Sequence, residues 1–117
     1  MKLTKKHFKI FKEECNLFIN KLGLTGYEIY YEFKELEDEE GASIQVNDEG
    51  RIATISLNIN HNNNKDTLIE GLKNYAKHEI LHLLLSRFSY YNYSRFVDKN
   101  SIKEAEEEIV IKLLKLL

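Results

Sequence analysis

The chain has 117 residues, 43% of them hydrophobic and 31% charged, a composition typical of one soluble globular domain over residues 1–117. Its formal net charge of only −2 excludes a strong overall attraction to nucleic acid or to an anionic membrane. The single cysteine, Cys15, excludes an intrachain disulfide and a thiolate-rich zinc cluster, and it indicates a reducing, cytoplasmic setting. We expect neither a signal peptide nor a membrane span, because no apolar run has the required length.

The first half of the chain predicts one helix followed by three strands. Apolar residues recur at helical spacing over residues 4–22, and Thr4 can cap the start of this helix. Cys15 belongs to the apolar pattern and is predicted to be a small buried hydrophobic side chain. Three strand-like runs follow, at 27–33, 43–46 and 51–59. The turn residues at 47–50 predict a hairpin between the last two runs.

The second half predicts two helices. A long helix is expected at 67–87, where Thr67 and Glu70 have the spacing of a capping box. Its centre is apolar on nearly every side, so this helix should lie deep in the domain. An aromatic and polar connection at 88–100 leads to a last helix at 101–117. The order of elements predicts an α+β fold in which a small antiparallel or mixed sheet packs against the central helix.

The most specific feature of the sequence is the segment 78–82, which reads His-Glu-Ile-Leu-His and has the HExxH pattern. Residues four apart lie on one face of a helix, so His78 and His82 can direct both imidazoles at one metal ion. Glu79 would lie beside that ion, where its carboxylate can take a proton from a metal-bound water as a general base. The pattern therefore predicts a Zn²⁺ site with two histidine ligands and one catalytic glutamate. The alternative is a pair of core histidines satisfied by hydrogen bonds.

A catalytic zinc usually takes three protein ligands, so a third is expected elsewhere in the chain. In the predicted last helix, Glu106 falls near the middle of the apolar face, where a carboxylate needs a cation or an ion pair. We therefore predict Glu106 as the third ligand, with Glu107 as the alternative if the helix is rotated. The competing interpretation is a buried salt bridge from Glu106, with a partner among Lys73, Lys77 and Arg87.

The HExxH segment, followed 24 residues after His82 by Glu106 in a second helix, resembles the gluzincin pattern of zinc metallopeptidases. More closely, the chain resembles the minimal zincin-like proteins of phages and mobile elements, which are similar in style to SprT-like and ImmA-type domains. The resemblance extends over most of the chain. It implies a zinc-dependent peptidase whose peptide or protein substrate pairs in extended form with an edge strand, here residues 51–59. The pattern leaves the ligand glutamate open among Glu106, Glu107 and Glu108.

Three functions are compatible with these features. The first is a metallopeptidase, in which a phenol or guanidinium from residues 90–95 could stabilise the oxyanion. The second is a zinc-binding interaction module without turnover, because a chain of this size has little room for substrate subsites. The third is a nucleic-acid-binding accessory protein, which the overall acidity disfavours. An open zinc position facing solvent favours the enzyme, whereas a position blocked by Tyr93 or by a fourth ligand favours the silent module.

Overall fold

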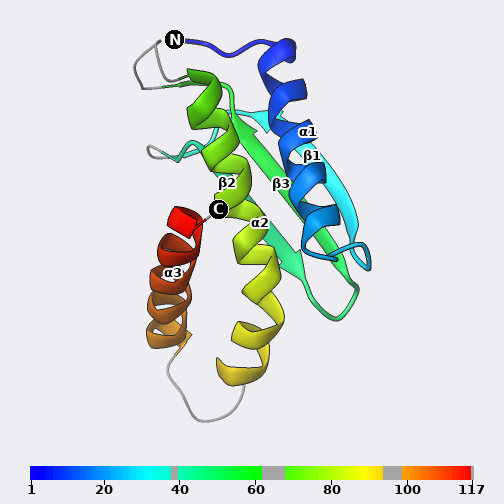
Figure 1. Ribbon diagram of the computed structural model, residues 1–117, viewed down its shortest axis with the longest axis vertical. Coiled ribbons are helices and arrows are strands. Elements are labelled where there is room, and N and C mark those ends of the chain that lie inside the picture. Colours follow the sequence, from blue (N-terminus) through cyan, green and yellow to red (C-terminus); the bar gives the residue numbers. More distant parts are fainter. Residues whose placement is uncertain (38–39, 62–67, 94–98, 117) are drawn as a thin grey trace.

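The computed structural model describes residues 1–37, 40–61, 68–93 and 99–116 (Figure 1). Their helices and strands are, in chain order, α1 (Lys5–Lys21), β1 (Glu28–Lys34), β2 (Ala42–Asn47), β3 (Ile52–Asn58), α2 (Leu68–Tyr93) and α3 (Lys99–Leu116). This order confirms the predicted α+β class, with one helix before three strands and two helices after them. Among the described helices, none combines the length and apolar character that a membrane span requires.

The three strands form a mixed sheet in the order β1-β3-β2. β1 runs parallel to β3, with Glu28 beside Ile52, and β2 runs antiparallel to β3, with Ala42 beside Leu57. The hairpin predicted at 47–50 is therefore present and joins β2 to β3. The sheet is mixed because β3 turns back from β2 and then lies alongside β1 in the same direction.

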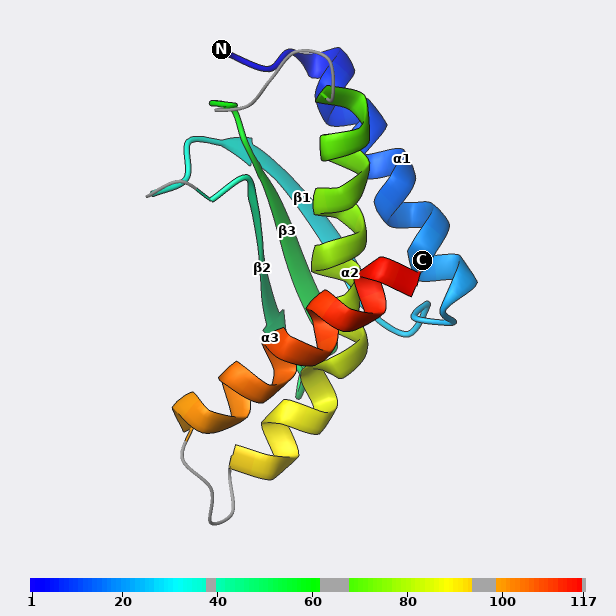
Figure 2. The same cartoon turned by 60° about the vertical axis from the view of Figure 1, so that its left-hand side comes forward.

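The expectation that residues 51–59 form an edge strand is wrong. β3 lies between β1 and β2, so both of its backbone edges are already hydrogen-bonded within the sheet. Its alternating pattern suggested a half-exposed strand, yet four consecutive residues, 55–58, are buried. The polar members of this run, Ser56 and Asn58, are buried as well, and the side chain of Asn58 donates a hydrogen bond to the carbonyl of Glu40 at 2.7 Å. The strand nearest α3 is instead β2, which lies at the sheet edge (Figure 2).

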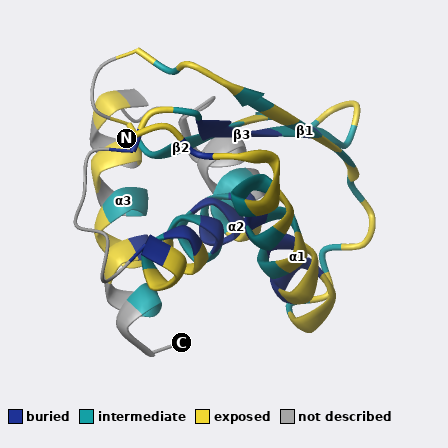
Figure 3. Ribbon diagram, turned by 90° about the horizontal axis from the view of Figure 1, so that it is seen from above, coloured by how far each residue is buried: buried dark blue, intermediate teal, exposed yellow. Residues whose placement is uncertain are grey.

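Helices α1 and α2 cover one face of the sheet, and α3 packs beside α2 on the side away from α1 (Figures 1 and 3). The core lies between the sheet and these two helices. It includes fully buried side chains from α1, β3 and α2, namely Phe11, Cys15, Ile55, Leu57, Leu72, Ala76 and Ile80. Cys15 is thus a buried core residue, as predicted, and burial raises the pKa of its thiol. The central position of α2 places residues 78–82 against the sheet.

The helix boundaries agree with the sequence at α1 and differ at α2 and α3. Thr4 is the N-cap of α1, and its backbone N–H donates to Nδ1 of His7 at 3.0 Å. α2 continues to Tyr93 and α3 begins at Lys99, so much of the predicted connection is helical. Residues 88–93 contain neither proline nor glycine, and each added helical residue gains a backbone hydrogen bond. The predicted capping role of Thr67 lies outside the described residues.

Candidate metal centre

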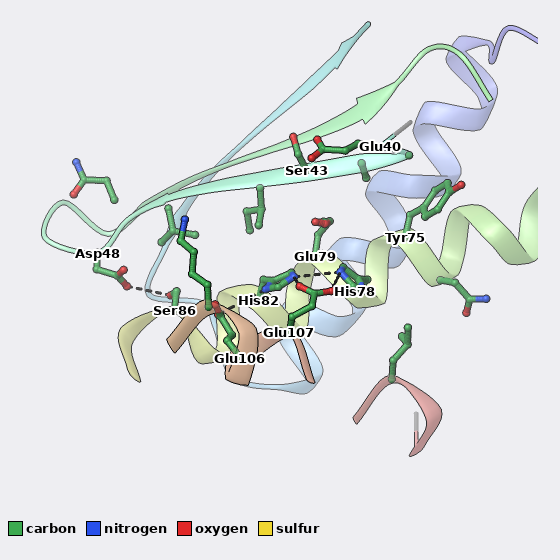
Figure 4. Close-up of a pocket in the computed structure, with 18 of the residues that line it drawn as sticks. Glu40, Ser43, Asp48, Tyr75, His78, Glu79, His82, Ser86, Glu106 and Glu107 are labelled. Atoms are coloured by element: carbon green, nitrogen blue, oxygen red, sulfur yellow. Dashed lines mark hydrogen bonds and ion pairs between the residues drawn. The ribbon is translucent and has the colours of Figure 1, made fainter. Parts of the chain in front are cut away.

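The two histidines of the HExxH segment converge as their spacing predicts. They lie one helical turn apart on α2, and their Nε2 atoms are 3.2 Å from each other (Figure 4). Their side chains are 30% and 20% exposed for His78 and His82, so both rings lie half-buried at the wall of a cavity. The position of α2 against the sheet holds both rings on the side that faces β2 and α3.

Glu107 on α3 completes a cluster of three donor groups. Its Oε1 atom lies 3.1 Å from Nε2 of His78, and its Oε2 atom lies 2.9 Å from Nε2 of His82. The carboxylate therefore spans the same two nitrogen atoms that the helical spacing brings together. In a tetrahedral zinc site with bonds of about 2.0 to 2.1 Å, neighbouring donor atoms are roughly 3.3 Å apart. The observed separations are close to this value, so the donor set fits a small divalent cation.

Glu106 occupies a different position from the one predicted for the third ligand. Its Oε1 atom lies 3.6 Å from Nδ1 of His82, the ring nitrogen that faces away from His78. Its side chain is only 13% exposed, in keeping with its predicted place on the apolar face of the helix, and the partner that it contacts is a histidine, which the sequence did not predict. The geometry favours the alternative, Glu107, as a ligand, and places Glu106 behind His82. Glu108 lies on the exposed side of α3.

Glu79 is the most deeply buried carboxylate of the site, with 5% of its surface exposed. One donor atom from each of His78, Glu79 and His82 lies within 4.8 Å of the other two, a group that could hold a metal ion. The Glu79 carboxyl group points from α2 towards β2, below Ser43 (Figure 4). Burial raises its pKa to about 7; His82 opposes this rise, while the carboxylates of Glu107 and Glu40 add to it. Glu79 can therefore exchange a proton near neutral pH.

The two imidazoles have opposite pKa shifts. Burial lowers the pKa of His78, the neighbouring His82 lowers it further, and Glu107 only partly opposes this. Burial also acts to lower the pKa of His82, but Glu106, Glu79 and Glu107 outweigh it, and the net shift is upward. His78 is thus readily neutral, the form that binds metal. His82 is surrounded by carboxylates that favour a proton on its ring when no cation is present.

The donor cluster opens into a cavity of about 1050 Å³. α2 forms its floor, α3 forms one wall, and β2 with the residues at its two ends forms the other (Figure 4). Glu79 lines this cavity and makes no hydrogen bond to any described residue. The cavity is large enough for several residues of a peptide.

The outer edge of β2 faces this cavity with backbone groups that pair with no described strand. The N–H of Asn58 donates a hydrogen bond to the carbonyl of Gly41 at 2.9 Å. In an antiparallel pair, hydrogen-bonded and non-hydrogen-bonded residue pairs alternate, so this bond shows which residues of β2 bond to β3. Every second residue of β2 therefore directs its N–H and C=O away from β3: Ala42, Ile44 and Val46. Within the described part of the chain, β2 pairs with β3 alone. This edge can accept another extended strand.

Sequence reasoning missed a polar cluster at the far end of the cavity. Asp48 accepts hydrogen bonds at Oδ1 from the hydroxyls of Ser86, at 3.1 Å, and Tyr27, at 3.2 Å. Asp48 was assigned only to the hairpin turn. Ser86 could have been found, because it lies four residues after His82 and continues the same stripe of α2. The cluster ties the end of β2 to the helix that carries the histidines.

The remaining sequence predictions for the site have mixed outcomes. Glu106 makes no ion pair with Lys73 or Lys77 within the described side chains, so this part of the salt-bridge interpretation is not supported. The aromatic segment 90–95 and Arg87 lie outside the side chains that the structure describes. His7 caps α1 and His61 is buried beside the N-terminal residues, and neither joins the cluster.

The fold and the site define an α+β protein with a His-Glu-His group that could hold a metal ion. We compared the chain with protein families, with curated proteins and with solved structures, and none of them matches it.

Proposed function

We propose that this protein is a zinc-dependent peptidase of the zincin-like type. The observation that carries the proposal is the convergence of three donor groups, His78, His82 and Glu107, beside the buried Glu79 and beneath a free strand edge. A cluster of core histidines alone would require neither the cavity nor a buried carboxyl group that faces it and makes no hydrogen bond to a described residue.

His78, His82 and Glu107 would hold the zinc ion. When bound, zinc supplies a Lewis acid that lowers the pKa of a coordinated water and polarises a carbonyl group. Glu79 then accepts a proton at its carboxylate from the attacking water and returns it to the departing amine of the cleaved peptide bond. In the metal-free protein burial raises the pKa of Glu79 to about 7, and a cation bound by the histidines would favour the carboxylate, the form that accepts the proton.

Glu106 acts as a positioning residue in this scheme. Its carboxylate beside Nδ1 of His82 favours a proton on that nitrogen and leaves the lone pair of Nε2 for the metal. Such a partner also fixes the orientation of the ring. This role explains why a buried glutamate lies next to the ligand glutamate in α3.

The substrate would pair with β2 rather than with residues 51–59. The backbone groups of Ala42, Ile44 and Val46 can form a ladder with an extended peptide, as in β-augmentation. Such a peptide would lie along the cavity above Glu79, with a peptide bond close to the two histidines. The backbone ladder would contribute affinity, and the side chains that line the cavity would contribute selectivity.

Metal content tests the ligand assignment. Protein purified without chelators or metal-affinity resin is analysed by inductively coupled plasma mass spectrometry, with Glu107→Ala, Glu79→Gln and the exposed control Glu104→Gln alongside wild type. We expect about one zinc per chain in wild type, Glu79→Gln and Glu104→Gln, and a strong loss in Glu107→Ala. A wild-type protein that folds without binding zinc would refute the proposal.

Peptide hydrolysis tests the activity. Wild type should cleave a denatured protein substrate, and the cleavage should stop in Glu79→Gln although zinc is retained. Retained zinc without cleavage in wild type would instead support the zinc-binding interaction module.

A further inference from the structure

The cavity is far more acidic than the chain as a whole. The full sequence is nearly balanced, with 17 lysines and arginines against 19 aspartates and glutamates. Among the described residues that line the cavity, by contrast, six carry a carboxyl group and only Lys103 carries a permanent positive charge. The donor cluster and its neighbours use three of these carboxylates: Glu79, Glu106 and Glu107. A bound dication would offset only two negative charges, so the cavity would remain acidic.

The carboxylates outside the donor cluster lie at the two ends of β2. Glu40 precedes the strand and Asp48 follows it (Figure 4). Glu49 comes directly after Asp48, and all three residues line the cavity. The lysine-rich helix α1 lies on the other side of α2 from α3 (Figure 1), and none of its residues lines the cavity. An extended peptide on β2 would therefore run between carboxylates at both ends of the strand. The carboxyl group of Glu79 is a further acceptor that faces the cavity. Glu79 is 95% buried and has no hydrogen-bond partner among the described residues.

Asp48 is held in place before any ligand arrives. Both of its described hydrogen bonds, from Ser86 and Tyr27, are made to Oδ1. The Oδ2 atom has no partner in the part of the chain that the structure describes. A carboxylate fixed in this way loses little conformational freedom when it receives an ammonium or guanidinium group.

The position of Asp48 defines where such a cationic group would lie. Ser86, which bonds Asp48, follows His82 by one helical turn, a rise of about 6 Å along α2. Two residues of an extended peptide span about 6.8 Å. A peptide side chain that reaches Asp48 would thus belong to a residue about two positions from the one that faces the histidine pair.

We propose that this cavity selects extended peptides that carry a lysine or arginine about two residues from the scissile bond, and that Asp48 receives this cationic side chain. This proposal rests on the proposed peptidase function, because a bound peptide has a scissile bond only if the protein cleaves it. The charge preference itself is a property of binding and can be measured without turnover.

The test uses fluorescence anisotropy with the Glu79→Gln protein loaded with zinc, so that peptides are bound but not cleaved. The probes are three labelled ten-residue alanine-glycine peptides, identical except for one central lysine, glutamine or glutamate. The affinity of each peptide is measured for the Glu79→Gln protein, which is the parent, and for three derivatives of it. The derivatives carry D48N, D48K or the exposed control E13Q in addition. D48N keeps an oxygen acceptor for Ser86 and Tyr27, and thermal unfolding checks that every variant is folded.

We expect the lysine peptide to bind the parent at least about tenfold more tightly than the glutamate peptide, with the glutamine peptide between them. D48N should remove most of this preference, D48K should invert it, and E13Q should leave it unchanged. Equal binding of the three peptides, no binding of the lysine peptide, or an unchanged preference in D48N would overturn the proposal. Hydrolysis by wild type is measured separately: charge selection without hydrolysis refutes only the peptidase function, whereas hydrolysis without charge selection refutes only this inference.

Discussion

Glu79→Gln should stabilise the metal-free protein at alkaline pH. In the folded chain, burial raises the pKa of Glu79 from its ordinary value of 4.5 to about 7. The folded state therefore binds a proton more tightly than the unfolded state does. The stability contribution of this group is fully present below pH 4.5 and is lost as the pH rises towards about 7.

The size of the effect follows from the difference between the two pKa values. Each pKa unit corresponds to about 1.4 kcal/mol, so a rise from 4.5 to about 7 corresponds to roughly 3 kcal/mol. Glutamine has the shape of the protonated glutamate and does not ionise. At pH 8, Glu79→Gln should thus be more stable than wild type by up to about 3 kcal/mol, and at pH 4 the two proteins should be nearly equal.

Urea unfolding in the presence of a chelator measures this difference. With a slope of about 1 to 3 kcal/mol per molar urea, the midpoint of Glu79→Gln should lie above that of wild type at pH 8 by up to about 1 to 3 M. The control Glu13→Gln removes an exposed carboxylate from α1 and should leave the midpoint unchanged at either pH. If Glu79→Gln is no more stable than wild type at pH 8, the reasoning from burial to pKa is wrong.

Three further variants test the packing and the site. Ile80→Ala should lower the free energy of unfolding by about 2 to 5 kcal/mol, because Ile80 is fully buried. The control Ile69→Ala, at a 44% exposed position, should change the free energy of unfolding little, and urea unfolding compares the two variants. Gly41→Ala should destabilise the protein by about 1 to 3 kcal/mol, because a Cβ atom there would collide with the ring of Tyr75. A double-mutant cycle tests this cause: the same substitution should destabilise a Tyr75→Ala protein less. Glu106→Gln should weaken zinc binding about 10- to 100-fold in a competition titration with a fluorescent chelator, and unchanged affinity would exclude the positioning role.

The local features of this chain were accessible from its sequence. Hydrophobic periodicity predicted α1 and the start of α2, and alternation together with turn residues predicted the strands to within a few residues. The convergence of His78 and His82 followed from the geometry of one helix, which needs no knowledge of the rest of the fold.

The features that depend on distant parts of the chain were not accessible in the same way. The order of strands is decided by pairing between segments far apart in sequence, and the alternation in residues 51–59 fits an edge as well as a centre. Glu106 and Glu107 differ by about 100° around α3, so the choice between them depends on how that helix is rotated against α2. Asp48 had an adequate local explanation as a turn residue, which hid its place in the cavity.

The central place of β3 also governs the order in which the chain can fold. β1 and β2 precede β3 in the sequence, and among the described strands each pairs with β3 alone, so neither gains sheet hydrogen bonds until residues 52–58 lie between them. β2 reaches β3 through the short turn at 47–50, whereas β1 pairs with β3 only after a loop that includes β2 has closed, and such non-local pairing slows folding. Glu107 follows later still, on the last described helix. A growing chain thus carries the β2–β3 hairpin and the HExxH segment before it carries Glu107, so the three donor groups come together only after α3 has packed against α2.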